Sequence, residues 1–230
     1  MSSEELVTKT AAYIKEKFTG EGSGHDWWHI YRVWQNALYL AQHEPADLLL
    51  VQLGALLHDI ADWKFHDGDE KAGDAAARKW LESLNVSNDI TSGVCQIINE
   101  VTFKGAGVAT QASSVEAKIV QDADRLDAIG AVGIARAFAY GGFKHREIYN
   151  PEEPPVQHDN FAAYQKNTSH TINHFYEKLL LLRDRMQTPT GRKLAEERHA
   201  YMQNFLDQFY REWKIDGNYD FNLNSSGQHL

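Results

Sequence analysis

Residues 53–62 read Leu-Gly-Ala-Leu-Leu-His-Asp-Ile-Ala-Asp, an apolar run that ends in adjacent ionisable side chains. A helix that is apolar on nearly every side is buried in the core of a protein. Burying an ionisable group costs several kcal/mol unless the group is paired or binds a metal ion. The run therefore predicts a buried helix whose terminal charges are compensated. The alternative is that the helix simply ends there, with His58 capping carbonyl groups and with Asp59 and Asp62 in solvent.

A second segment, residues 24–33, reads Gly-His-Asp-Trp-Trp-His-Ile-Tyr-Arg-Val and marks the start of another predicted helix. His25 and His29 are four residues apart, so they share one face of a helix, as two metal ligands can. Asp26 stands at a glycine-rich helix start, where an N-cap is its natural role. We therefore expect His29, deeper in the helix, to be the better ligand and His25 to form a hydrogen bond behind the ligands. The alternatives for His25 are a ligand of a second metal ion and a contact with phosphate.

A third segment, residues 118–127, reads Lys-Ile-Val-Gln-Asp-Ala-Asp-Arg-Leu-Asp and carries three carboxylates within six positions. Carboxylates so close repel one another unless a cation neutralises them or they face different ways. The alternative is a helix N-cap with acids in the first turn, which would assign no chemistry to Asp122, Asp124 or Asp127. Each segment alone has a structural explanation, so their combination carries the argument.

Taken together, the three segments resemble the HD-domain phosphohydrolase superfamily, whose pattern is a His on one helix, a His-Asp pair on a later helix and a distal Asp. The agreement spans roughly residues 20–140. The sequence looks closest to the bacterial branch of stand-alone HD hydrolases, some of which act on nucleotides. The resemblance implies that one metal ion is held by His29, His58, Asp59 and Asp124.

Helical periodicity dominates the chain, and alternating apolar and polar runs are scarce, so we predict an all-α protein. We expect one compact HD-type helical domain over residues 1–217. It would hold a motif core at about 20–140, a long loop at about 141–159 and C-terminal helices at about 160–213, followed by a frayed tail at 218–230. The predicted helices span residues 3–18, 26–43, 46–60, 69–84, 87–101, 113–122, 125–140, 159–186 and 190–213.

The predicted loop at residues 141–159 holds Gly141–Gly142 and three prolines, a composition that excludes a continuous helix. Loops of this length in a compact domain are often lids or binding segments, and a passive connector is the alternative. As a lid, the loop would bring Lys144 and Arg146 over the phosphate chain of a substrate.

The formal net charge of −9 argues against binding of a nucleic-acid polymer, because affinity for a phosphate backbone comes from clustered Lys and Arg. No stretch approaches the roughly 20 apolar residues needed to cross a bilayer, and the acidic start lacks the features of a signal peptide. We therefore expect a cytoplasmic protein without membrane contact. Cys95 is the single cysteine, which excludes an internal disulfide and a cysteine-based zinc site. The expected partner is a small phosphorylated molecule, and a homodimer is compatible with the sequence.

Two imidazoles and two carboxylates suit Mn²⁺, Fe²⁺, Co²⁺, Ni²⁺ or Zn²⁺ better than Mg²⁺, which prefers oxygen ligands and keeps its waters. We expect one divalent ion, with Mn²⁺ as the first choice. Such an ion polarises a phosphoryl oxygen and lowers the pKa of a bound water. Hydrolysis by that water needs no covalent intermediate on the protein, and we find no motif for a nucleophilic Ser or Cys.

A carboxylate outside the metal ligands can orient the attacking water or accept its proton. In several HD hydrolases an acidic residue at this position after the His-Asp pair serves in catalysis, so the resemblance assigns that role to Asp62. On a continuing helix Asp62 would lie near the same face as Asp59. Asp67 is the second candidate, because it falls in the loop just past the same helix, and an ordinary turn or N-cap role is its alternative.

Phosphate groups must be held by cations or by backbone N–H groups. Arg32, one turn after His29, is the first choice. Arg125, beside Asp124, either contacts phosphate or pairs with acids and holds the acidic cluster together. The remaining candidates are Lys64, Lys104 and Lys144. For these lysines and for Arg146, a solvated surface charge is the favoured interpretation.

We expect the substrate to be a nucleoside or deoxynucleoside triphosphate that is hydrolysed to a monophosphate and pyrophosphate. One metal ion and a few basic side chains can neutralise a small polyanion on an otherwise acidic protein. Three alternatives stay open: a 5′-nucleotidase-type phosphomonoesterase, a di-iron HD-fold oxygenase that needs additional ligands, and a metal-binding regulatory module without chemistry.

Overall fold

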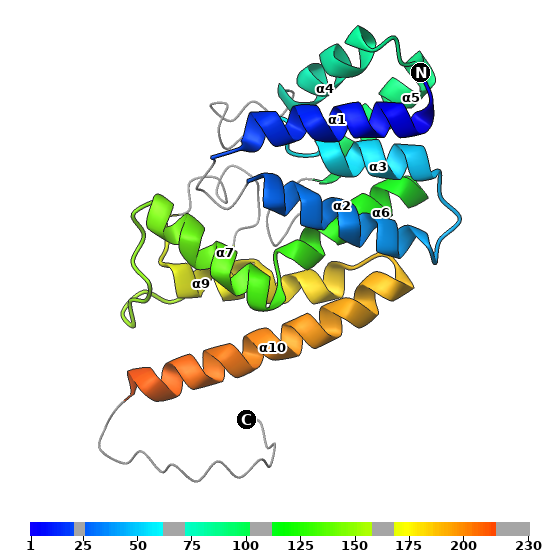
Figure 1. Ribbon diagram of the computed structural model, residues 1–230. Helices are drawn as coiled ribbons and strands as arrows, with labels where there is room; N and C mark the ends of the chain where they lie inside the picture. The colour runs from blue at the N-terminus through cyan, green and yellow to red at the C-terminus, as the bar shows by residue number, and fades with distance from the viewer. Residues whose placement is uncertain (21–25, 62–71, 102–111, 158–167, 215–230) are drawn as a thin grey trace.

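The structure is a computed structural model, and the all-α prediction is confirmed (Figure 1). It describes residues 1–20, 26–61, 72–101, 112–157 and 168–214. The helices are α1 (Ser3–Phe18), α2 (Trp27–Ala41), α3 (Leu48–Leu57), α4 (Ala72–Ser83), α5 (Asn88–Val101), α6 (Val115–Asp127), α7 (Gly130–Phe143), α9 (Thr171–Glu177), the 3₁₀ helix η2 (Leu179–Arg185) and α10 (Pro189–Trp213). These ranges contain no β-strand, and none of their helices is long and apolar enough to span a membrane.

Three helices, α2, α3 and α6, form the centre of the fold and pack against one another. In Figure 1 they run side by side, with α1, α4 and α5 above them and α7, α9 and α10 below. Two clusters of buried apolar side chains fill the space on either side, and Trp34 and Leu50 pack against both clusters. Helices α2 and α3 therefore contribute to both clusters, whereas the buried apolar residues of α6 belong to one of them.

The apolar helix α3 is buried, as predicted. Its residues Leu53, Leu56 and Leu57 have no exposed surface, and burying each such side chain contributes about 1.5–3 kcal/mol. A Cβ atom at Gly54 would lie 2.9 Å from Ile97 Cγ2, so glycine lets α5 approach α3 closely. The predicted continuation of the helix is wrong, because α3 ends at Leu57 and residues 58–61 form a turn.

Helix α6 continues unbroken to Asp127, whereas the sequence predicted a break after residue 122. Ser114 caps the start of the helix, eight residues before that break. Ala123 and Leu126 are fully buried, so the apolar face of the helix continues past the predicted break. The three aspartates of this segment therefore lie in the last two turns of α6, and their explanation as an N-cap with first-turn acids is wrong.

The predicted helix over residues 159–186 is replaced, in its described part, by α9 and η2. His170 is the N-cap of α9, and its Nδ1 accepts a hydrogen bond from Asn173 N–H at 3.2 Å. Lys178, with φ −142° and ψ −60°, leaves helical geometry and separates α9 from η2. Neither His170 nor Lys178 is next to a Gly or Pro, so the sequence carries no sign that a helix begins or ends at these positions. Residues 158–167 lie outside the described residues.

Helix α7 includes Gly141–Gly142, so the prediction that these glycines lie in a loop is wrong. A Cβ atom at Gly141 would lie 2.2 Å from Thr171 Oγ1, so glycine here allows close packing of α9 on α7. The irregular segment begins at Lys144 and is described through residue 157. Tyr149 in this segment stacks edge-on against three rings of α10, namely Phe209, Tyr210 and Trp213.

The ends of the three central helices meet near one point (Figure 1). Asp26 is the N-cap of α2, as predicted, and its carboxylate accepts a hydrogen bond from His29 N–H at 2.8 Å. This cap fixes where α2 begins and therefore places His29 in the first turn, where its side chain reaches the end of α3. His58 follows that end directly, and Asp124 lies in the last turns of α6.

Candidate metal centre

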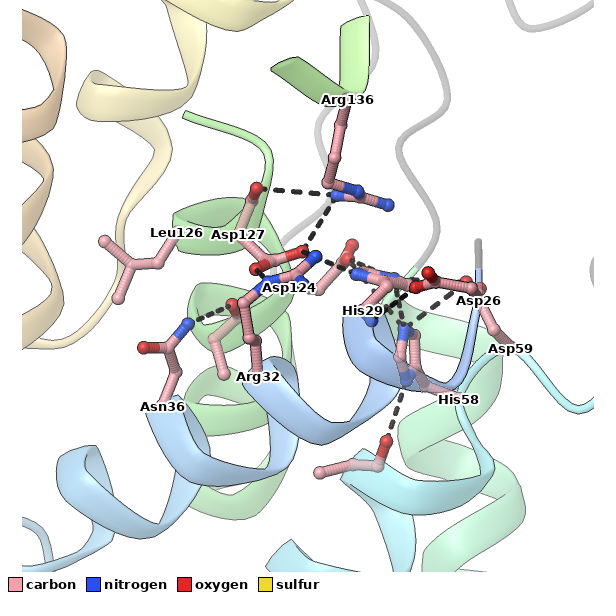
Figure 2. A network of polar contacts seen from close by, with 12 residues as sticks. Asp26, His29, Arg32, Asn36, His58, Asp59, Asp124, Leu126, Asp127 and Arg136 are labelled. Carbon is pink, nitrogen blue, oxygen red and sulfur yellow. Dashed lines mark hydrogen bonds and ion pairs between the residues drawn. The ribbon is translucent and has the colours of Figure 1, made fainter. Parts of the chain in front are cut away.

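Four side chains from these helix ends converge, as Figure 2 shows. The Nε2 atoms of His29 and His58 are 3.3 Å apart. Asp59 Oδ2 lies 3.3 Å from His29 Nε2 and 3.6 Å from His58 Nε2. Asp124 Oδ1 lies 3.6 Å and 3.8 Å from the same two nitrogens. The structure thus brings together the four residues that the resemblance named as ligands, and we call them the ligand group.

The spacing within the ligand group fits one divalent ion. Ligand atoms bound at about 2.1 Å are about 3.0 Å apart along an octahedral edge and about 3.4 Å apart along a tetrahedral one. The distances above, 3.3–3.8 Å, lie within about 0.4 Å of the tetrahedral value and exceed the octahedral value by about 0.3–0.8 Å. His29, His58 and Asp59 each offer an atom within 4.8 Å of the others, whereas Asp124 is more exposed to solvent, with 31% of its side chain accessible.

Both imidazoles are oriented by a hydrogen bond at their other nitrogen. His29 Nδ1 lies 2.7 Å from Asp127 Oδ2, and His58 Nδ1 lies 2.8 Å from the carbonyl oxygen of Ala55. A carbonyl and a carboxylate only accept hydrogen bonds, so each Nδ1 carries a hydrogen, and in the neutral ring the Nε2 lone pair is then available to a metal ion. This arrangement is typical of metal-binding histidines. His58 does bond a carbonyl, as the alternative explanation required, but Asp59 is mostly buried, with 14% of its side chain exposed.

Buried charges around the ligand group shift two pKa values in opposite directions. Burial alone would raise the pKa of Asp127, but hydrogen bonds from His29 and Arg32 and the charge of Arg136 hold it well below its usual range. Burial and Arg136 act to lower the pKa of His29, and hydrogen bonds to Asp127 and Asp59 outweigh them, so this pKa is raised. A proton therefore competes with a metal ion for His29.

The three aspartates of α6 face different ways, which relieves their repulsion. Asp124 joins the ligand group and Asp127 bonds His29 behind it. Asp122 accepts hydrogen bonds from the backbone N–H groups of Gln187 and Thr188 at the start of α10, the latter at 2.7 Å. Only one of the three carboxylates therefore lies among the ligands.

The two arginines expected to hold phosphate have different surroundings. Arg32 binds Asp127 through Nε and Nη2, at 2.6 Å and 3.1 Å, while 34% of its side chain stays exposed. Arg125 is buried: it donates to the carbonyl oxygen of Arg185 and lies 3.9 Å from Asp122. These contacts resemble the structural alternative for Arg125, in which it pairs with acids.

Lys144 follows the last residue of α7 and is exposed, with its ammonium 5.4 Å from the ring centre of Phe143 and 5.8 Å from that of Tyr140. Four other predicted site residues lie outside the described residues: Asp62, Lys64, Asp67 and Lys104. His25 lies outside them too. The roles of all these residues stay predictions.

Two residues that contact the site, Asp127 and Arg136, were not predicted from the sequence to be site residues. Asp127 had appeared only as one of three clustered acids, although its i,i+3 spacing from Asp124 on a helix was a signal that both lie near one face. Arg136, on α7, donates to Asp127 Oδ2 at 3.1 Å. Nothing in the local sequence around Arg136 indicated this contact, because it depends on how α7 folds back against α6.

Comparison with known proteins gives consistent matches. A model of the HD domain matches residues 27–129, which include the whole ligand group. The chain is 40% identical over 201 residues to the protein YpgQ of Bacillus subtilis (strain 168), covering 87% of this chain and 90% of YpgQ. The structure of an HD-superfamily hydrolase from Bacillus thuringiensis is similar, with a TM-score of 0.70 and 40% identity, covering 93% of this chain and 100% of that one. The structure of Bacillus subtilis YpgQ in complex with ADP has a TM-score of 0.71 and 34% identity, covering 91% and 98%.

Proposed function

This chain belongs to the HD-domain family. From that membership and from the ligand group, we propose that the protein hydrolyses nucleoside or deoxynucleoside triphosphates to a monophosphate and pyrophosphate. The observation that carries the proposal is the convergence of two imidazole Nε2 atoms and two carboxylates within 3.3–3.8 Å contacts. Such a donor set has the composition and spacing of a hydrolytic metal site.

The ligand group would hold one first-row divalent ion, for which we propose Mn²⁺. When bound, such an ion polarises a phosphoryl oxygen and lowers the pKa of a water that it binds. The protein contributes the fixed orientation of both imidazoles, through Asp127 and the Ala55 carbonyl. Two carboxylates in the group offset the charge of the ion, and we propose that a substrate phosphate approaches beside Asp124, whose side chain is 31% exposed.

Arg32 is the side chain that we propose for direct contact with a substrate phosphate. It lies one turn beyond His29 on α2, and its guanidinium is already fixed in orientation by Asp127. About a third of the side chain is exposed, and its Nη1 is not used in the two bonds to Asp127. A planar guanidinium in a fixed orientation is well suited to charge-assisted hydrogen bonds with phosphate oxygens.

We propose Asp62 as the group that accepts the proton of the attacking water, with Asp67 as the second candidate. Lys64, Lys104 and Lys144 are further candidates for contacts with the outer phosphates. We do not propose Arg125 for this role, because its side chain is buried and donates to a backbone carbonyl.

The nucleotide part of the proposal is supported by a relative. YpgQ, 40% identical to this chain, has a structure in complex with ADP. ADP contains a nucleoside and linked phosphates, the two features that a nucleoside triphosphate would present. The net charge of −9 is compatible with such a ligand, because a metal ion and nearby guanidinium groups act locally.

The test is a panel of nucleoside mono-, di- and triphosphates with Mn²⁺, Mg²⁺, Co²⁺ and Ni²⁺, in which phosphate and pyrophosphate are quantified separately. We expect pyrophosphate and a monophosphate in equal amounts from triphosphates. Inorganic phosphate from monophosphates alone would identify a 5′-nucleotidase-type phosphomonoesterase instead. If no nucleotide yields a product, the proposal is contradicted and a regulatory module is favoured. Two iron ions per chain, in protein purified with iron, would favour the oxygenase.

A further inference from the structure

Asp127, the last residue of α6, is a buried carboxylate surrounded by hydrogen-bond donors (Figure 2). Its Oδ2 accepts from His29 Nδ1 at 2.7 Å and from Arg32 Nη2 and Arg136 Nη1 at 3.1 Å each. Its Oδ1 accepts from Arg32 Nε at 2.6 Å. Three side chains from two other helices thus depend on one carboxylate for their orientation.

The partners of Asp127 have different access to solvent. The side chain of His29 is 1% exposed and reaches the ligand group, whereas that of Arg32 is 34% exposed. Arg136 is 16% exposed and also donates to the backbone carbonyl of Asp127 at 3.4 Å. One carboxylate therefore connects a buried metal ligand with an arginine that is accessible to a substrate.

We propose that Asp127 is a positioning residue that couples metal binding to phosphate binding, by fixing the ring of His29 and the guanidinium of Arg32 at the same time. The phosphate half rests on the proposed function. Arg136 serves as the second cation that keeps the carboxylate in place. The ligand chemistry is a polyphosphate chain with one phosphate at the metal ion and the next against Arg32.

The test measures two affinities in the full chain, that of Mn²⁺ for the chelator-treated protein and that of tripolyphosphate for the Mn²⁺-loaded protein. Asp127→Asn should weaken Mn²⁺ binding by about 10–100-fold, the usual effect of losing the partner of a ligating histidine. It should also weaken tripolyphosphate binding. Arg32→Gln should weaken tripolyphosphate binding by about tenfold and leave Mn²⁺ affinity within about threefold of the wild type.

The double variant tests the coupling itself. If Asp127 positions Arg32, adding Arg32→Gln to Asp127→Asn should change tripolyphosphate affinity by less than about threefold, because the arginine is already misplaced. Additive losses, wild-type Mn²⁺ affinity in Asp127→Asn, or no binding of tripolyphosphate to the loaded wild type would each overturn the proposal. The Mn²⁺ titration needs no nucleotide, so it stays informative if nucleotide hydrolysis fails.

A matched control separates positioning from stability. Asp122→Asn alters another buried aspartate of α6, whose partners lie at the start of α10. This variant should unfold at lower denaturant concentration and keep wild-type Mn²⁺ affinity. If Asp127→Asn does not fold, Asp127→Glu retains the charge but displaces the carboxylate by one methylene. It should show the same two losses to a smaller degree, and two unchanged affinities would contradict the proposal.

Discussion

The two imidazoles of the ligand group are oriented by partners that differ in their distance along the chain. His58 bonds the carbonyl of Ala55, three residues earlier, so its orientation follows from the end of one helix. His29 bonds Asp127, which is 98 residues away. The orientation of His29 therefore depends on the packing of α2 against α6. We expect mutations that shift these two helices to affect His29 before His58.

The first prediction concerns the metal content of His58→Ala. The wild type should bind about one first-row divalent ion per chain, and the variant should lose it on dialysis, because a four-ligand set loses its geometry with any one member. Elemental analysis after dialysis measures this. His43→Ala, an exposed histidine at the far end of α2, is the control and should keep the metal. Full occupancy in a combined His58→Ala, Asp59→Ala variant would show that the ion binds elsewhere.

The second prediction concerns turnover in Asp62→Asn. Loss of a general base typically slows the chemical step by a factor of about 10²–10⁴, so kcat should fall by that amount while metal content stays at the wild-type level. Parallel kinetics and elemental analysis check both quantities. Wild-type turnover with the same metal content would remove Asp62 from the mechanism, and Asp67→Asn is then the variant to measure.

Two adjacent glycines in α7 show how contacts between helices decide the choice of residue. Gly141 and Gly142 both lie within the helix, where glycine is less stable than alanine by about 0.5–1 kcal/mol. Only Gly141 is confined: a Cβ atom there would meet Thr171 of α9, whereas one at Gly142 would meet nothing within 4 Å. Glycine at position 141 is therefore explained by packing, and the structure shows no such reason at position 142.

The third prediction compares alanine at these two positions. Gly141→Ala should destabilise the protein by about 1–3 kcal/mol, because α9 or the side chain of Thr171 must move. Gly142→Ala should be neutral or stabilise it by up to about 1 kcal/mol, because the substitution removes backbone freedom from the unfolded chain. Urea denaturation of both variants measures the difference. Equal free energies of unfolding would show that α9 does not pack as closely on α7 as described.

Across the whole molecule, the ligand group joins three helices that lie far apart in the sequence. His29, His58 and Asp124 come from α2, the end of α3 and α6, which pack on one another in the centre of the fold. The carboxylate oxygens of Asp59 and Asp124 lie 3.3–3.8 Å from the two Nε2 atoms. An ion bound among these atoms would bridge the three helices directly.

The fourth prediction is therefore that metal binding stabilises the fold. A ligand that binds only the folded state adds about 2.7 kcal/mol at a concentration 100 times its Kd. For a chain of this size, that corresponds to a rise in Tm of about 5–10 °C. Thermal melts of chelator-treated protein with and without Mn²⁺ measure the rise. The His58→Ala, Asp59→Ala variant should show no shift, and an equal shift there would mean that the ion acts at another site.

Local sequence patterns predicted much of the fold. The all-α class follows from helical periodicity, and the N-cap role of Asp26 follows from its place before the second helix. The buried α3 follows from an apolar run that no surface helix would carry. These three features depend on residues that are neighbours in the chain, so the sequence determines them directly. The four residues of the ligand group were named by their resemblance to the HD-domain pattern, and their convergence depends on the packing of α2, α3 and α6.

The direction of individual side chains was decided only by the tertiary structure. Asp122, Asp124 and Asp127 lie within six positions, yet they face the start of α10, the ligand group and two arginines. The surroundings of each carboxylate depend on how α6 packs against other helices. The partner of Asp122 lies 65 residues away, at the start of α10, and His29, the partner of Asp127 on α2, lies 98 residues away. Arg136 comes from α7, which packs against α6. The pairing of Arg32 and Arg136 on one carboxylate depends on the same packing. A sequence pattern specifies which groups can ionise or bind a metal, but their partners are set by how distant helices pack.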